Sequence, residues 1–332
     1  MSKRVKTVFT VLILILISNH IYAGGQSSQQ TAGKTNLNWP RNTLSIIVPV
    51  DVGGNMDVKA RIVAKYLPKY IGGVNVIVEN RPGAGGITAL TEYLVEPPNT
   101  SSLLYVSGSH VVINPYYNNV RYTRNDFIPL VCTDEVLNGL FVSPEKTGAR
   151  NLQELITYGQ GKIVKFGASA TGDTYLMTKA LLTMAGLRSD VVDANSAPEH
   201  LVNTMAGHVD LGYAGLNLGR AYVEEGKLVC IGAFTEKPYT GFKGTTVPSF
   251  KEQGYDIVHS AFTYFTIRSG TDQAIVDYIK NALMQVMQDP EFRNEFTNAG
   301  FDIVDDPSPE AIQRKINILA NNLEELNKLI SR

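Results

Sequence analysis

Hydrophobic and polar positions along the chain alternate between short apolar runs and longer stretches with helical spacing. Apolar residues at intervals of three and four predict helices over 57–67 and 86–96, and Pro68 ends or kinks the first of them. Apolar runs rich in β-branched residues predict strands buried on both faces at 44–50, 74–80 and 102–108. This βαβαβ order predicts a parallel sheet with right-handed crossovers.

A second series of alternating elements follows. Two helices near the C-terminus are predicted to begin at Asp289-Pro290 and at Ser308-Pro309, because Asp and Ser cap helix N-termini and proline is favoured in the first helical turn. Further helices are predicted over 174–186, over 198–208 and after Thr271. Strands are predicted at 138–144, 162–169, 190–195, 209–215, 228–234 and 261–270. Two α/β series closed by helices predict two lobes around a cleft, with the ligand beyond the carboxyl ends of the strands.

Four loops at these strand ends are the candidate binding elements: 49–57, 80–88, 107–115 and 168–174. Backbone N–H groups near helix N-termini favour a carboxylate or phosphate, and glycine lets the backbone come close to a ligand. The stretch GAGGIT has two glycines of the dinucleotide fingerprint, but Thr88 replaces the third, and the chain has no Gly-Lys-Ser/Thr. For Gly53-Gly54, a simple tight turn stays an open alternative.

No catalytic or metal-binding constellation is visible. His110, His200, His208 and His259 lack metal-ligand spacing, and the stretch GASAT lacks the second glycine of a nucleophile elbow. His200 is expected at the surface or in the core, whereas a ligand contact and a structural role are both open for His110. Asp57 is expected to cap or support the first helix. We therefore expect a binding protein without cofactor, metal or enzymatic activity.

The first 23 residues have the features of a secretory signal peptide. Lys3, Arg4 and Lys6 precede an apolar stretch at 8–17, and Ala23 ends a plausible cleavage site. An uncleaved anchor stays open, because Ile21 is not the small residue usual at its position. Residues 24–38 are polar and aperiodic, which predicts a disordered tether, with order beginning near Trp39.

The net charge bears on the class of partner, and the two cysteines bear on disulfide formation. Loss of the three basic residues of the signal segment changes the formal net charge from −1 to −4, and no basic stripe with interleaved aromatics is present. Both features disfavour nucleic acid as a partner. Cys132 and Cys230 would meet an oxidising compartment after export, so a disulfide and two buried free thiols are both open. A disulfide would stiffen the base of the second lobe.

Six motifs follow one another in a defined order from Trp39 to the C-terminus. They are Trp39-Pro40, Pro49 followed by GGNMD, the stretch from Val78 to Gly86, Asn114-Pro115 with Tyr122 and DFIP, AGHVD at 206–210, and Pro248 with Glu252 and Gly254. In this order they resemble the substrate-binding receptors of tripartite tricarboxylate transporters, also called the Bug family.

The resemblance implies a two-lobed periplasmic-binding-protein fold (type II, Venus flytrap), each lobe a mainly parallel sheet flanked by helices. Lobe 1 would comprise 39–130 and 256–332, lobe 2 would comprise 131–255, and hinges would lie near 128–136 and 235–262. It implies a periplasmic monomer that binds a small carboxylate (a di- or tricarboxylate, an amino acid or an aromatic acid) and delivers it to membrane permease subunits. The expected ligand-binding residues are Val50, Asp51, Gly53, Gly54, Asn55, Ala84, Gly85, Gly86, Ser109, His110, Ser169, Thr171, Thr174 and Ala214.

Three departures from the family pattern leave the ligand class open. Asp51 replaces a neutral residue in the first ligand loop, residues 192–196 lack the usual Val-Pro-Tyr-x-Gly, and Ala214 stands where many relatives have Asp. A carboxylate at Asp51 would repel a bound acid unless it points away or meets an amine of the ligand. A signalling receptor and, less favoured, a nucleotide-using enzyme are the alternative functions.

Overall fold

The computed structural model describes residues 39–168, 173–193 and 196–330. The predicted signal peptide and tether, and the candidate residues Ser169 and Thr171, lie outside these described residues. Among the described residues, no helix combines the length and the apolar character that crossing a membrane requires.

Nine strands of the described residues form one mixed sheet in the order β2-β1-β3-β11-β4-β7-β5-β6, with β8 paired to β4. The first strand group joins β1 in parallel to β2 and β3, and β11 lies antiparallel to β3. The second group joins β5 in parallel to β6 and β7. The bounds are β1 (Thr43–Val48), β2 (Asn75–Asn80), β3 (Ser102–Ser107), β4 (Phe127–Val142), β5 (Ile163–Ala168), β6 (Arg188–Asp193), β7 (Leu211–Gly215), β8 (Val229–Ala233) and β11 (Ser260–Arg268).

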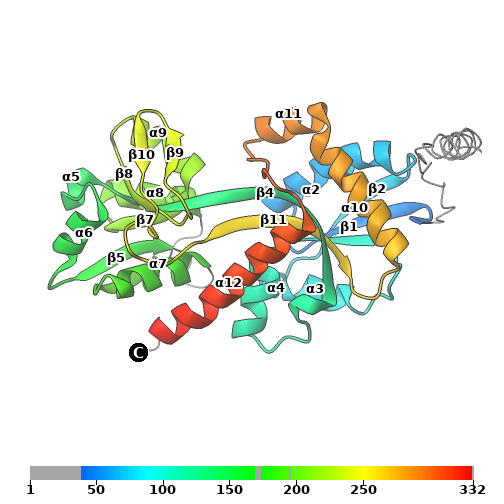
Figure 1. The fold of residues 1–332 in the computed structure, drawn as a ribbon, viewed down its shortest axis with the longest axis horizontal. Coiled ribbons are helices and arrows are strands. Elements are labelled where there is room, and N and C mark those ends of the chain that lie inside the picture. The colour runs from blue at the N-terminus through cyan, green and yellow to red at the C-terminus, as the bar shows by residue number, and fades with distance from the viewer. Residues whose placement is uncertain (1–38, 169–172, 194–195, 331–332) are drawn as a thin grey trace, which may run out of the picture. The chain divides into compact units, whose positions relative to one another are not determined.

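Strand β4 belongs to both groups. Its residues 127–137 pair antiparallel with β11, and its residues 138–142 pair antiparallel with β7 and β8. Figure 1 shows β4 and β11 side by side, running between the two strand groups. We call the segment where β4 and β11 pass from one strand group to the other the crossing. The parallel strands of both groups direct their carboxyl ends toward this crossing.

Helices cover both faces of the sheet. The longest, α12 (Pro309–Ile330), packs against α4, α7 and β4, so that it contacts elements of both strand groups. The other helices are α2 (Asn55–Tyr66), α3 (Ile87–Tyr93), α4 (Gly108–Tyr117), α5 (Pro144–Thr147), α6 (Leu152–Gly159), α7 (Asp173–Met184), α8 (Ala197–Ala206), α9 (Leu216–Glu224), α10 (Gln273–Gln288) and α11 (Pro290–Asn298). Short 3₁₀ turns span Leu67–Tyr70, Ala84–Gly86 and Arg124–Asp126, and β9 (Tyr239–Phe242) forms a hairpin with β10 (Thr245–Val247).

The predicted strands are confirmed with end shifts of a few residues, and β4 begins eleven residues earlier than predicted. The predicted helix caps are also confirmed: Asp289 accepts from the N–H of Glu291 (2.9 Å), and Ser308 accepts from the N–H of Ala311 (3.2 Å). The α-helix α2 ends at Tyr66, and Pro68 lies in the following 3₁₀ turn.

The prediction of a loop over 107–115 is wrong, because α4 occupies most of that segment. Ser107 and His110 form a reciprocal cap at its start, and Val111, Val112 and Ile113 are buried in the core. Burial of this apolar face outweighs the weak helix propensity of Gly108 and Ser109. The helices α6 and α9 and the β9–β10 hairpin were not predicted from the sequence.

The two cysteines are free and buried, which decides the open question of their pairing. Cys132 lies near the start of β4, and Cys230 lies on β8 beside Phe141 at the far end of β4. Burial raises the pKa of Cys230 to about 12. The hypothesis of a disulfide that stiffens lobe 2 is therefore wrong. The lobe boundaries stay a prediction, since residues 39–332 form one compact unit.

A buried ion pair between Lys59 and Asp134 joins α2 to β4 at the crossing. We expect Lys59→Ala and Lys59→Met each to lower the free energy of unfolding by about 3–5 kcal/mol, because either change leaves the buried Asp134 carboxylate without its cation. Chemical denaturation measures this. Methionine keeps most of the side-chain volume, so equal losses would assign the effect to charge.

Lys65→Ala is the matched control, since the Lys65–Glu295 pair is exposed and its loss should change stability little. A loss for Lys59→Met no larger than that of the control would contradict the prediction.

Candidate functional site

Within the first candidate segment, 49–57, the residues 50–54 before α2 are held by the buried carboxylate of Asp57 in the first turn of that helix. Asp57 Oδ2 accepts hydrogen bonds from the N–H of Gly53 (2.8 Å) and from Nε of Arg61 (2.9 Å). Asn80 Nδ2 donates to Asp57 Oδ1 (2.9 Å) and to the carbonyl of Val50 (3.1 Å). Burial acts to raise the pKa of Asp57, but these hydrogen bonds bring it below its usual value. The prediction that Asp57 supports the first helix is confirmed.

The second candidate loop is a left-handed turn. Gly83, Ala84, Gly85 and Gly86 have φ angles of 133°, 49°, 62° and 92°, and the N–H of Gly86 donates to the carbonyl of Gly83 (2.9 Å). Ala84 and Gly85 are exposed, so the turn presents its backbone to solvent. Left-handed backbone is accessible to glycine at little cost, which explains the glycine-rich sequence.

Gly86 is the point where the turn after β2 meets the end of β1 and the start of α4. A Cβ atom on Gly86 would lie 2.5 Å from Cδ2 of His110 and 3.2 Å from Cβ of Pro49. Asn114 of α4 also donates to the carbonyl of Gly85 (2.9 Å). Glycine at this position therefore allows the ends of β1 and β3 and the turn after β2 to pack against one another.

His110 is neutral at physiological pH. Burial lowers its pKa to about 4, against an opposing effect of the Asp173 carboxylate. Its Nδ1 accepts a hydrogen bond from the N–H of Ser107 (3.0 Å), so the proton of the neutral ring lies on Nε2. His110 thus has the structural role that the sequence left open, and it keeps a donor at Nε2.

Asp173, the first residue of α7, connects this cluster to the second strand group. Its carboxylate pairs with Nε2 of the buried His259 (2.9 Å) and accepts from the N–H of Thr174 (2.9 Å). Burial acts to raise the pKa of Asp173, but the hydrogen bond and charge of His259 outweigh it, so the pKa lies below its usual value. The charge of Asp173 also acts on His110 of α4, since it opposes the lowering of the His110 pKa.

Two buried hydroxyl groups lie near Asp173 without partners. Thr174 Oγ1 and Tyr213 Oη make no hydrogen bond with the described residues. Burial and the nearby Asp173 charge raise the pKa of Tyr213 well above its usual value, so the phenol keeps its proton as a donor. Native proteins pair nearly all buried polar groups, so two orphan hydroxyls beside the ends of the strands indicate a binding position.

The structure brings some candidate residues together and separates one. Ala214 is buried in a hydrophobic cluster with Phe141 and Leu201, away from the loops. Asp51 is exposed. One cluster comprises Ala84, Gly85, Gly86 and His110. The adjoining loop and the start of α2 contain Val50, Gly53, Gly54 and Asn55. Ser109 lies in the first turn of α4, and Thr174 lies in the first turn of α7.

Sequence reasoning missed Asp173, Tyr213 and His259. Alternation along β7 gives a signal for Tyr213, because it faces away from Gly212 and Ala214, whereas Asp173 and His259 meet across 86 positions, which no spacing rule identifies. In the part of the chain that the structure describes, no three His, Cys, Asp or Glu side chains gather as metal ligands would.

The family model described as the tripartite tricarboxylate transporter family receptor matches residues 59–332. The chain belongs to this family. Membership makes the protein a solute-binding receptor and not an enzyme, and the family predicted from the six motifs is confirmed.

Curated and solved relatives agree with this membership. A protein of Cupriavidus necator encoded in the gbd 5′ region is 26% identical over 274 residues, which are 80% of each chain. A TctC solute-binding protein from Polaromonas has the same fold, with a TM-score of 0.76 at 21% identity over 88% of this chain and 99% of that one. The predicted periplasmic-binding-protein fold is therefore confirmed.

Two further proteins of this fold have been solved with acids. A protein of R. palustris with adipate has a TM-score of 0.69 at 22% identity, over 88% of this chain and 98% of that one. MatC from Rhodopseudomonas palustris with bound malate has a TM-score of 0.67 at 19% identity, over 88% of this chain and 100% of that one.

Because the pKa of His110 is lowered, the stability of the receptor should depend on pH. Between the ordinary value of 6.5 and about 4, the unfolded chain binds a proton at this residue and the receptor does not. Stability should therefore fall as pH falls through this window, by at most about 1.4 kcal/mol per unit. Unfolding free energies from pH 7 to 4 should fall less steeply for His110→Gln, because glutamine keeps the N3 cap without titrating.

Titration of His110 by NMR gives an independent check. A midpoint near 6.5, or a pH dependence unchanged in His110→Gln, would contradict this account.

Proposed function

We propose that this receptor binds a small carboxylate in the periplasm and delivers it to the membrane subunits of a tripartite tricarboxylate transporter. The ligand lies between the turn at 83–86 with the N-termini of α2 and α4 on one side, and Thr174 with Tyr213 on the other. The orphan hydroxyls of Thr174 and Tyr213 carry this proposal.

The groups that surround this position favour an anion. The two hydroxyls and Nε2 of neutral His110 are donors, and the glycine-rich turn offers backbone N–H groups. The Asp173 carboxylate already accepts hydrogen bonds from His259 and from the N–H of Thr174, so its oxygens have donors within the protein. A carboxylate accepts several such hydrogen bonds at once, and charge-assisted bonds are the stronger ones.

The ligands of relatives point to the same chemistry. Adipate and malate, bound by two proteins of this fold, are both small dicarboxylates. Family membership supports the transporter as partner, and the signal-peptide pattern of residues 1–23 supports export to the periplasm.

Binding drives closure in this proposal. The lobes are 39–130 with 256–332, and 131–255, and the hinges are the segments near 128–136 and 235–262. A ligand that contacts both lobes binds the closed arrangement more tightly and therefore shifts the population toward it. The membrane subunits then recognise the closed receptor.

Native mass spectrometry of the exported protein and a thermal-shift screen of di- and tricarboxylates, amino acids, aromatic acids and nucleotides test the ligand class. A co-purified or stabilising carboxylate supports the proposal. Stabilisation by a nucleotide, with no response to any acid, would refute it.

Removal of the orphan hydroxyls should separate binding from stability. Tyr213→Phe and Thr174→Val should each weaken affinity for the carboxylate found in the screen by about ten- to hundredfold, since a hydrogen bond to a charged group contributes about 1.5–3 kcal/mol. Neither change should lower the melting temperature, because neither hydroxyl has a partner among the described residues. Calorimetric titration and thermal unfolding measure the two effects.

Thr204→Val is the matched control. The Thr204 hydroxyl donates to the carbonyl of His200 within α8 (2.7 Å), so its removal should lower stability and leave affinity unchanged. Full affinity in both Tyr213→Phe and Thr174→Val would place the ligand elsewhere.

A further inference from the structure

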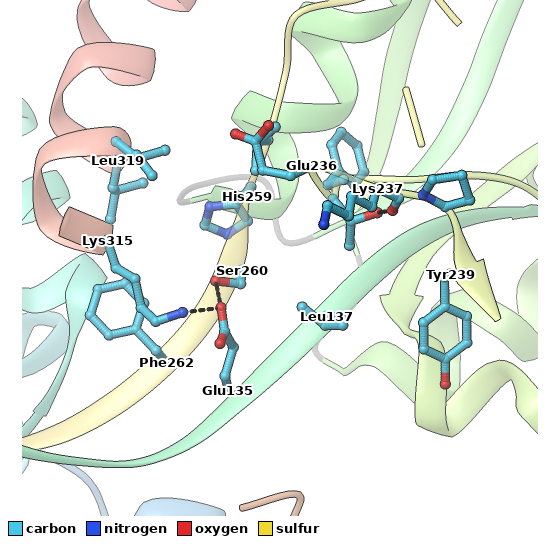
Figure 2. Close-up of a pocket in the computed structure, with 15 residues that line it drawn as sticks. Glu135, Leu137, Glu236, Lys237, Tyr239, His259, Ser260, Phe262, Lys315 and Leu319 are labelled. Carbon is cyan, nitrogen blue, oxygen red and sulfur yellow. Dashed lines mark hydrogen bonds and ion pairs between the residues drawn. The ribbon is translucent and has the colours of Figure 1, made fainter. Parts of the chain in front are cut away.

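A second cavity lies beneath α12 and adjoins the candidate carboxylate site at His259, which lines the cavity and pairs with Asp173. Its volume is about 410 Å³, and none of the expected ligand-binding residues that the structure describes lines it. Cavities of roughly 300–1,000 Å³ are typical of small-molecule sites. Figure 2 shows Lys315 and Leu319 of α12 on one side and Glu236, Lys237 and Tyr239 on the other, with Glu135, Leu137 and Ser260 between them. We call it the α12 cavity.

The walls of the α12 cavity are largely apolar. They include Leu137, Phe234, Val258, Phe262, Ile318 and Leu319. Leu137 and Ile318 are 36% and 40% exposed, which is high for such side chains in a folded chain. Both side chains line the same cavity, so an apolar ligand bound there would remove their exposed surface from water.

Among the lysine and glutamate side chains of the lining, Lys237 is the one for which no ion pair is found within the described residues. Glu135 pairs with Lys315 and accepts from the hydroxyl of Ser260 (2.5 Å). Glu236 pairs with Lys251 (2.8 Å), which does not line the cavity. Lys237 pairs with no carboxylate of residues 39–168, 173–193 or 196–330. An anionic group on the ligand would therefore meet the ammonium of Lys237.

We propose that the α12 cavity is a second binding site, which takes an amphipathic monocarboxylate with an aromatic or branched aliphatic body. The body packs on the apolar walls beneath α12, and the carboxylate pairs with Lys237 at the opposite side. Several elements form this site, because its lining comes from β4, the segment between β8 and β9, the start of β9, β11 with the two residues before it, and α12. Its ligand differs from a dicarboxylate in having one charged end and one apolar end.

Phenylacetate is a suitable probe for calorimetric titration of the exported full-length receptor. We expect one saturable event at the α12 cavity, and weaker binding of phenethylamine, which has the same ring and the opposite charge. Ile318→Trp fills the cavity and should weaken phenylacetate binding at least about tenfold. Lys237→Gln should weaken it about two- to fivefold, as expected for a partly exposed charge pair.

Matched controls change similar residues elsewhere. Val202→Trp places the same ring at an apolar side chain that is 50% exposed on α8, and Lys243→Gln removes an exposed lysine outside the lining. Both should bind phenylacetate like the unchanged protein.

Three outcomes would overturn the proposal: no saturable phenylacetate binding, unchanged affinity in Ile318→Trp, or a loss in Tyr213→Phe as large as that in Ile318→Trp. The last result would assign phenylacetate to the carboxylate site. Because none of these outcomes depends on dicarboxylate binding, the second site can fail while the receptor function stands.

Discussion

A single buried carboxylate fixes the geometry on which the candidate site depends. Asp134 lies on β4 at its crossing between the strand groups, and only 2% of it is exposed. Lys59 of α2 neutralises it, and the hydroxyls of Thr133 and Thr263 donate to it. A charge buried this deeply is tolerated only when it is paired and hydrogen-bonded. The first helix, the crossing strand and its antiparallel partner are therefore held in one relative arrangement.

The binding loops follow from that arrangement. With β4 and β11 antiparallel at the centre, the parallel strands on either side end toward each other. The turns after β1 and β2 and the start of α4 then meet at Gly86, and the N-terminus of α7 lies where His259, which precedes β11, reaches Asp173.

The sequence predicted most of the fold because its strands are continuous apolar runs, and because the family motifs fix their order. It misassigned α4, since Gly108 and Ser109 are typical of a loop while His110 acts as a helix cap in place of Glu or Gln. The sequence indicated the turn at 83–86, because its positive φ angles favour glycine and a glycine-rich stretch is visible in the sequence. It missed the Asp173–His259 pair and the orphan phenol of Tyr213, because tertiary contacts alone create them.

In the proposed function, neutral donors recognise the anion. The two arginines beside the first loops are already committed: Arg61 pairs with Asp57, and Arg81 pairs with Glu79 and Glu96. His110 is neutral, so the donors left for a ligand are backbone N–H groups, one imidazole N–H and two hydroxyls. Such fixed dipoles stabilise a carboxylate while adding no net charge, and their directions select its geometry. Because no long cationic side chain must be ordered, binding energy would remain available for the proposed closure of the lobes.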